Sequence, residues 1–160
     1  MSFVAGRTVT LKPGEGRTFQ APGHPTTFKA TTEDTAGAYL LLEVALTGGG
    51  PPQHIHHREE EAFYILEGEV NVKIGEETLK CTVGSYVLIP RGTVHTFWNA
   101  GATPAKFLAI VSPPAGFEQM AIELFGAGEM GADNYNPRIM ARLMAISQKY
   151  GRETVGPPLG

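Results

Sequence analysis

Apolar and polar residues alternate along much of this chain, in the pattern of β-strands that bury one face. Val70, Val72 and Ile74 alternate with Asn71 and Lys73, because successive side chains of a strand point to opposite faces. Similar runs, rich in β-branched and aromatic residues, are separated by turn sequences rich in glycine and proline. The pattern predicts an all-β domain with strands over residues 8–11, 26–30, 38–47, 62–67, 69–74, 77–81, 86–89, 95–98 and 106–111.

The pattern changes to helical spacing after residue 112. Apolar residues recur through residues 117–124, and Gly126 is expected to end this first helix. A second helix is predicted to begin at Pro137, with Asn136 as its N-cap, and to run towards residue 151. We interpret both helices as scaffold that covers a sheet face or builds a subunit contact, rather than as part of a site.

The composition of the chain excludes several kinds of protein but does not by itself indicate a function. The chain has 160 residues, the length of one domain, and 42% of them are hydrophobic and 18% charged. A formal charge of −3 gives no basic surface for nucleic acid or an anionic membrane. A single cysteine excludes an intramolecular disulfide. The first residues lack the pattern of a secretory signal, and no apolar run is long enough to span a bilayer, so we expect a cytoplasmic protein.

Three histidines and one glutamate have a spacing that two adjacent β-hairpins can bring to one metal ion. His54 and His56 share a strand face at i, i+2, whereas Glu61 lies an odd number of positions later, so a turn or bulge must intervene. His95 arrives from a later strand as the fourth ligand. Three neutral nitrogens and one carboxylate suit one divalent first-row ion (Mn, Fe, Co, Ni, Cu or Zn) and leave room for substrate or water.

These four residues belong to two longer blocks of fixed spacing. The blocks read Gly48-x5-His54-x-His56-x4-Glu61-x6-Gly68 and Gly84-x5-Pro90-x-Gly92-x2-His95-x3-Asn99. The chain thereby resembles the cupin superfamily, whose two motifs contain the same ten positions. The resemblance implies a single jelly-roll β-barrel of six to ten antiparallel strands with short C-terminal helices, in which His54, His56, Glu61 and His95 bind the metal.

The resemblance also implies a domain organisation and a partner. The whole chain, residues 1–160, forms one cupin domain with an N-terminal arm (1–35), a barrel core (about 36–112) and a C-terminal helical extension (113–160). Small cupins commonly dimerise, so we expect a homodimer. The apolar stripe Ile139, Leu143 and Ile146 on the last helix offers a surface for that contact or for docking on the barrel.

Within the superfamily, residues 51–69 and the segment 113–118 are most similar to single-domain flavonol (quercetin) dioxygenases. That resemblance implies a catalytic Glu61 that both binds metal and takes the proton of a substrate hydroxyl. By alternation, Phe63 and Ile65 share the face of Glu61, and Phe97 shares that of His95. These three apolar residues predict a substrate pocket for a flat, small hydroxylated aromatic or flavonol-like molecule, although Phe63 and Phe97 can equally be core residues.

Two other functional classes remain open from the sequence. A non-oxidative metal-dependent cupin, such as an isomerase or decarboxylase, would use the same ligands and would need basic residues inside the barrel to hold an anionic substrate. Few basic residues fall at predicted interior positions, which disfavours that class. A small-molecule-binding module without turnover is the third class.

The other glutamate, histidine and cysteine residues considered are not expected to form the site. Glu59 and Glu60 are expected in a solvated turn, and His57 at the surface or beside a ligand. His24 is expected to be a plain loop histidine in Pro-Gly-His-Pro. Cys81 is interpreted as a small buried apolar residue, because no feature of its sequence neighbourhood indicates an activated thiol.

Overall fold

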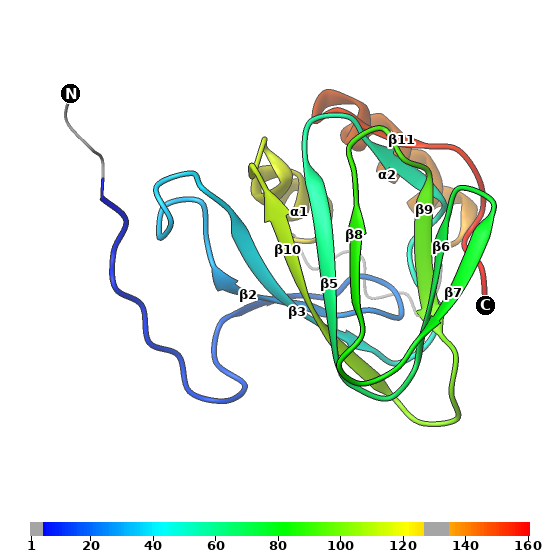
Figure 1. Cartoon of the computed structure of the whole chain (residues 1–160). Helices are drawn as coiled ribbons and strands as arrows, with labels where there is room; N and C mark the ends of the chain where they lie inside the picture. Colours follow the sequence, from blue (N-terminus) through cyan, green and yellow to red (C-terminus); the bar gives the residue numbers. More distant parts are fainter. Residues whose placement is uncertain (1–4, 127–134) are drawn as a thin grey trace.

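The computed structural model describes residues 5–126 and 135–160, which fold into two antiparallel sheets and two helices (Figure 1). The first sheet has the strand order β1-β2-β3-β10-β5-β8 and the second β11-β4-β9-β6-β7. The strands in chain order are β1 (Arg17–Phe19), β2 (Thr26–Ala30), β3 (Leu40–Leu46), β4 (His54–His56), β5 (Glu60–Glu67), β6 (Val70–Ile74), β7 (Glu77–Cys81), β8 (Tyr86–Ile89), β9 (His95–Asn99), β10 (Ala105–Ser112) and β11 (Arg152–Thr154).

The core lies between the two sheets, and the alternation seen in the sequence selects which side chains enter it. In β3, Leu40, Leu42, Val44 and Leu46 are buried while the residues between them are partly exposed. Its partner β10 follows the same rule in register, with Phe107 opposite Val44. Burial of large apolar side chains from both sheets is the main stabilising contribution, and it gives the predicted jelly-roll arrangement.

The structure corrects the expected strands in three respects. Residues 8–11 form no strand, and Val9 and Leu11 remain about 40% exposed, because no neighbouring strand pairs with them. The short strands β1 and β11 were not predicted, and the described strands exceed the expected six to ten. The two sheets share no strand within residues 5–126 and 135–160, so the expected barrel is an open, two-sheet form of the jelly roll.

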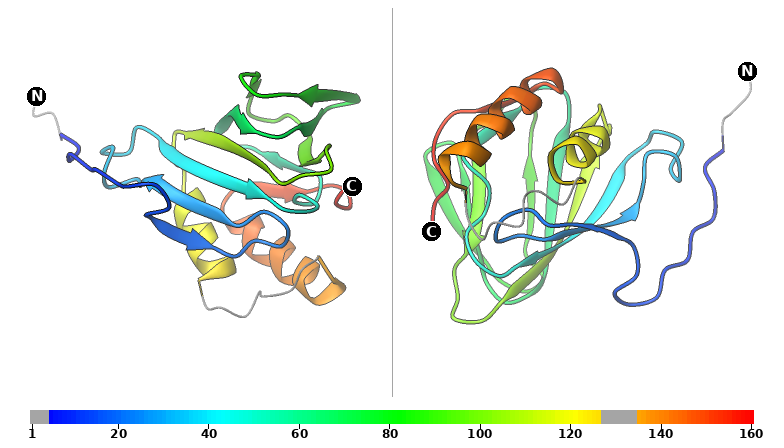
Figure 2. Two further views of the ribbon diagram at one scale, coloured as in Figure 1. Left: turned by 90° about the horizontal axis from the view of Figure 1, so that it is seen from below. Right: turned by 180° about the vertical axis from the view of Figure 1, so that it is seen from behind.

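The two helices are close to their predicted limits and lie side by side (Figure 2). Helix α1 (Phe117–Phe125) ends at Gly126, and α2 (Pro137–Lys149) begins after Asn136, whose side chain accepts a hydrogen bond from the amide of Ile139. Ile139 and Leu143 of the apolar stripe on α2 are buried within the chain, which agrees with the docking alternative and not with an exposed stripe. No helix among the described residues is long and apolar enough to cross a membrane.

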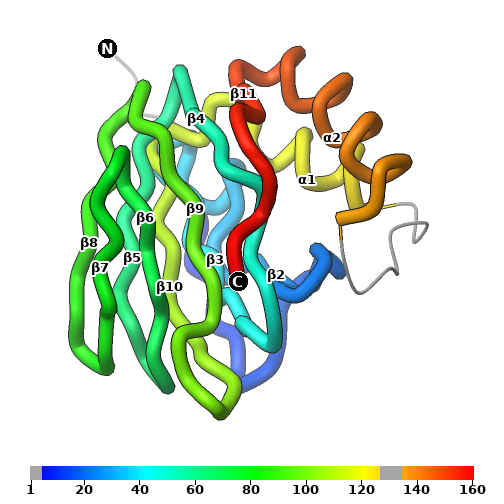
Figure 3. Tube along the Cα trace, turned by 90° about the vertical axis from the view of Figure 1, so that its right-hand side faces the viewer, coloured from blue at the N-terminus to red at the C-terminus, as the bar shows by residue number. Residues whose placement is uncertain are grey.

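Strand β11 follows α2 and joins the second sheet at its edge, beside β4 (Figure 3). The turn between α2 and β11 contains Gly151, whose φ of +72° is readily adopted only by glycine. This connection brings the C-terminal segment against the strand that carries two predicted metal ligands. The helical extension is therefore part of the wall around the site, and the interpretation of it as scaffold alone is wrong.

Candidate metal centre

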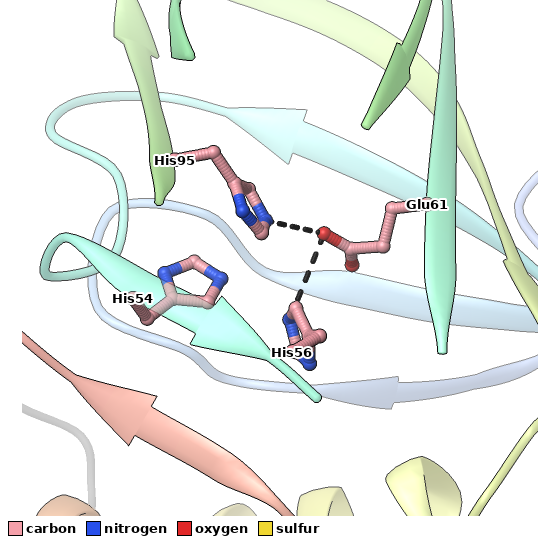
Figure 4. A group of neighbouring side chains, drawn as sticks. All are labelled: His54, His56, Glu61 and His95. Atoms are coloured by element: carbon pink, nitrogen blue, oxygen red, sulfur yellow. Dashed lines mark hydrogen bonds and ion pairs between the residues drawn. The ribbon is translucent and has the colours of Figure 1, made fainter. Parts of the chain in front are cut away.

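Three strands position the four predicted metal ligands. His54 and His56 project from β4, and His54 is the cross-strand partner of His95 in β9. The chain turns through residues 57–59 before β5 begins, and this turn brings Glu61 to the same point, as its spacing from His56 required. Figure 4 shows the four side chains converging from these strands.

The ligand atoms form one buried cluster. Each residue offers a nitrogen or oxygen within 4.8 Å of the others, and all four residues are buried. Glu61 Oε2 lies 2.8 Å from His95 Nε2 and 3.6 Å from His56 Nε2 (Figure 4). Ligands about 2.1 Å from one ion would lie ~3 Å apart at right angles and ~4.2 Å apart across the ion, so the cluster is close to the dimensions that a single metal ion needs.

The outer nitrogen of each imidazole is already committed to an acceptor. Nδ1 of His54 donates to the Pro52 carbonyl at 2.7 Å, and Nδ1 of His95 donates to the Thr93 carbonyl at 2.9 Å. Since a carbonyl oxygen can only accept, these Nδ1 atoms carry the proton and each Nε2 presents a lone pair. Such hydrogen bonds fix the tautomer and orientation of metal-binding histidines.

Glu59 has the same role for His56, and the sequence interpretation of Glu59 as a solvated turn residue is wrong. Its side chain is 1% exposed, and Oε1 accepts a hydrogen bond from His56 Nδ1 at 2.6 Å. Glu59 Oε2 is also buried and has no hydrogen-bond partner among the described residues. The i, i+3 spacing from His56 is the signal that could have identified Glu59. Glu60 is half-buried at the start of β5.

The electrostatics leave Glu61 and His54 in the forms that a metal requires. Burial raises the pKa of Glu61. The interactions of its carboxylate with His56, His95 and Arg152 outweigh burial and lower this pKa to about 2. Burial first, and then the positive charge of Arg152 and the neighbouring imidazoles, lower the pKa of His54 well below its ordinary value. At neutral pH Glu61 is therefore a carboxylate and His54 a neutral imidazole. The four residues fit a divalent first-row ion.

A cavity of about 90 Å³ opens beside the cluster, and both the sheets and the helices line it. Phe63 and Phe97 of the predicted pocket are among its lining residues, together with Phe117 of α1. Ile65 is fully buried in the apolar core and is not among the lining residues. The apolar surface beside the ligands therefore comes from both sheets and from the C-terminal extension.

Three polar residues in this cavity were not identified from the sequence. His24 is buried rather than a plain loop histidine: its Nδ1 donates to the Pro22 carbonyl at 2.8 Å, and burial chiefly lowers its pKa to about 4. Its Nε2 lies 3.4 Å from the hydroxyl of Tyr135, whose pKa burial raises. Arg152 of β11 is buried and lines the same cavity.

Arg152 weakens the argument that too few basic residues lie in the interior for an anionic substrate. The sequence gives no local signal for it, because its burial depends on α2 returning the chain to the edge of β4. Two other interpretations agree with the structure. His57 is exposed and pairs with Glu153 at 2.9 Å, and Cys81 is buried, with a pKa that burial raises.

Comparisons with known proteins agree with the fold described above. Residues 41–111 match the family model described as a cupin domain. An uncharacterized protein of Methanocaldococcus jannaschii is 30% identical over 99 residues, covering 62% of this chain and 75% of that protein. A germin-like protein of Arabidopsis thaliana is 39% identical over 88 residues, which cover 50% of this chain and 39% of that protein, so the chain spans less than half of that plant relative.

Among solved structures, the chain is similar to a protein from Thermotoga maritima described as a predicted oxalate decarboxylase. The TM-score is 0.61 at 20% identity, and the match covers 66% of this chain and 99% of the other. Identity at this level bears on the fold alone. The matched family region ends at residue 111, so the helices and Arg152 lie outside it.

Proposed function

Because the chain belongs to the cupin superfamily, we propose that it is a metal-dependent enzyme, and specifically a dioxygenase of small hydroxylated aromatic compounds. The supporting observation is the buried set of three histidines and one glutamate beside a cavity lined by aromatic side chains. Four protein donors of this kind leave coordination positions open, where a redox-active divalent ion would bring dioxygen and a substrate oxygen together.

In this proposal, residues of the chain would accept the substrate proton, hold the aromatic ring and orient a metal ligand. Glu61 is ionised at neutral pH, and it would accept the proton of the substrate hydroxyl as that oxygen approaches the site. Phe63 and Phe97 would hold the aromatic ring and exclude water. Glu59 would keep the His56 ring oriented through their 2.6 Å hydrogen bond.

The size of the cavity favours a single aromatic ring over a flavonol. An apolar cavity of about 150 Å³ is known to accommodate benzene, and the cavity here is about 90 Å³. A ring-sized substrate would fit with small adjustments, whereas a three-ring flavonol would require the helices to move away from the sheets. We therefore place small phenols and catechols ahead of flavonols as substrates.

A second candidate is a non-oxidative metal-dependent enzyme, such as a decarboxylase or isomerase. Arg152 supports it, because a buried guanidinium beside the ligands provides the grip on an anionic substrate that this class requires. The two candidates share the ligands and differ in whether dioxygen is consumed.

Oxygen consumption separates the candidates. Purified protein loaded in turn with Mn²⁺, Fe²⁺, Co²⁺, Ni²⁺, Cu²⁺ or Zn²⁺ would be mixed with catechols, hydroxybenzoates, flavonols and small diketones in an oxygen electrode. The dioxygenase proposal predicts uptake stoichiometric with product for at least one ring-sized substrate. Product formation that continues without oxygen would instead support the non-oxidative enzyme, and an inert metalloprotein would support a binding module.

A further inference from the structure

Arg152 is a buried cation that makes no close ion pair with a described carboxylate. Its residue is 7% exposed, and its one hydrogen bond among the described residues runs from Nη1 to Ser147 Oγ at 3.3 Å. No described carboxylate oxygen lies within 4.0 Å of its guanidinium nitrogens. Arg152 interacts with the charges of Glu61 and Glu59 only beyond ion-pair distance, which leaves guanidinium N–H groups available to a ligand in the cavity.

The fold places this cation next to the metal ligands. Arg152 is the cross-strand partner of His56, and Thr154 that of His54, and directly opposed residues of antiparallel strands share a face of the sheet. The Arg152 side chain therefore lies on the side where both histidines project. Arg152, His54, His56 and Glu61 all line the same cavity.

From this geometry we infer that Arg152 binds the carboxylate of the substrate while the reacting part of the same molecule lies against the metal ligands. The inference rests on the proposed function and narrows its substrate class to small hydroxylated aromatic carboxylates. The planar guanidinium presents parallel N–H donors that match a carboxylate in a bidentate pair. The aromatic lining of the cavity would hold the ring between the two polar ends.

Paired carboxylate and amide ligands test this inference directly by binding. Isothermal titration calorimetry of the metal-loaded protein would compare benzoate with benzamide, and 2-hydroxybenzoate with 2-hydroxybenzamide, which share shape and differ in charge. The expected result is a preference of about 10- to 100-fold for each carboxylate. Equal affinities in the wild-type protein, or no binding of either carboxylate, would overturn the inference without any variant.

The Arg152→Met variant then assigns the preference to this side chain. It should retain the metal content and the β-sheet circular dichroism of the wild type and lose the carboxylate preference. The exposed Arg91 provides the matched control, and Arg91→Met should change nothing. An unchanged preference in Arg152→Met refutes the assignment. A lower melting temperature with loss of metal would likewise mean that Arg152 is structural.

This design separates the inference from the proposed function. Carboxylate binding that depends on Arg152, in a protein that consumes no oxygen with any hydroxylated aromatic, would support the anion site and refute the dioxygenase. Oxygen uptake with neutral phenols at rates unaffected by Arg152→Met would support the dioxygenase and refute the anion site.

Discussion

Replacing Glu59 by glutamine removes a charge that supports the metal centre without contacting the metal. Glu59 Oε1 accepts the Nδ1 proton of His56 at 2.6 Å, and its second oxygen has no partner among the described residues. Glutamine keeps a hydrogen-bond acceptor of the same size. It loses the negative charge that makes the Nε2 atom of His56 more basic and therefore a stronger metal ligand. Because Glu59 Oε2 is buried and has no hydrogen-bond partner among the described residues, removing the charge offsets part of the weakening of the His56 hydrogen bond, so we expect the variant to fold.

The expected loss of metal affinity follows from such supporting contacts, which are typically worth 10- to 100-fold. We expect Glu59→Gln to weaken metal affinity about tenfold, which corresponds to about 1.4 kcal/mol. Glu59→Leu should approach 100-fold, because it leaves the buried Nδ1–H of His56 without an acceptor. Competition with a chromophoric chelator for Zn²⁺ at pH 7 measures both. The half-buried Glu60 is the matched control. The reasoning fails if Glu59→Gln binds within twofold of wild type, or if Glu60→Gln weakens binding equally.

Three further predictions address catalysis, packing and pH. Glu61→Gln should keep much of its metal and lose about 10² to 10⁴ in turnover rate; a wild-type rate would remove Glu61 from the mechanism. Gly50→Ala should lower the melting temperature far more than Gly84→Ala. A Cβ at Gly50 would lie 1.6 Å from the Phe97 carbonyl oxygen, whereas a Cβ at Gly84 would have no atom within 4 Å, and only the positive φ disfavours alanine there. Equal shifts in melting temperature would refute this. His24 has a pKa of about 4 in the folded protein, so the unfolded chain takes up the proton first and stability falls as pH drops from about 6.5 to about 4, by about 3 kcal/mol. Urea unfolding at pH 7 and 4.5 should show a smaller loss in His24→Asn than in wild type; identical losses would contradict the burial argument.

The sequence predicted the long strands because each buries one face over at least four residues. β2, β7 and β8 have the predicted limits, and β3 keeps its alternation throughout. Three-residue strands such as β1 and β11 are too short to show a period. The segment 8–11 shows a clear alternation and yet forms no strand, because pairing depends on a neighbour that alternation cannot supply.

The same distinction separates the predicted from the missed site residues. His54, His56, Glu61 and His95 belong to motifs whose spacing is local to two pairs of strands, so the sequence was sufficient to bring them together. Arg152 becomes a site residue only because α2 and a tight turn return the chain to β4. Long-range packing of this kind has no signature in the spacing of residues.

Metal content is the most direct test of the central claim, that these four side chains form one metal site. Wild-type protein exchanged into each divalent ion, freed of excess and analysed by inductively coupled plasma mass spectrometry, should hold about one ion per chain for at least one metal. The double variant His54→Ala, His56→Ala should hold almost none while keeping its β-sheet circular dichroism, and His57→Ala, altered at an exposed neighbour, should bind as wild type does. Undiminished metal in the folded double variant would contradict the assignment.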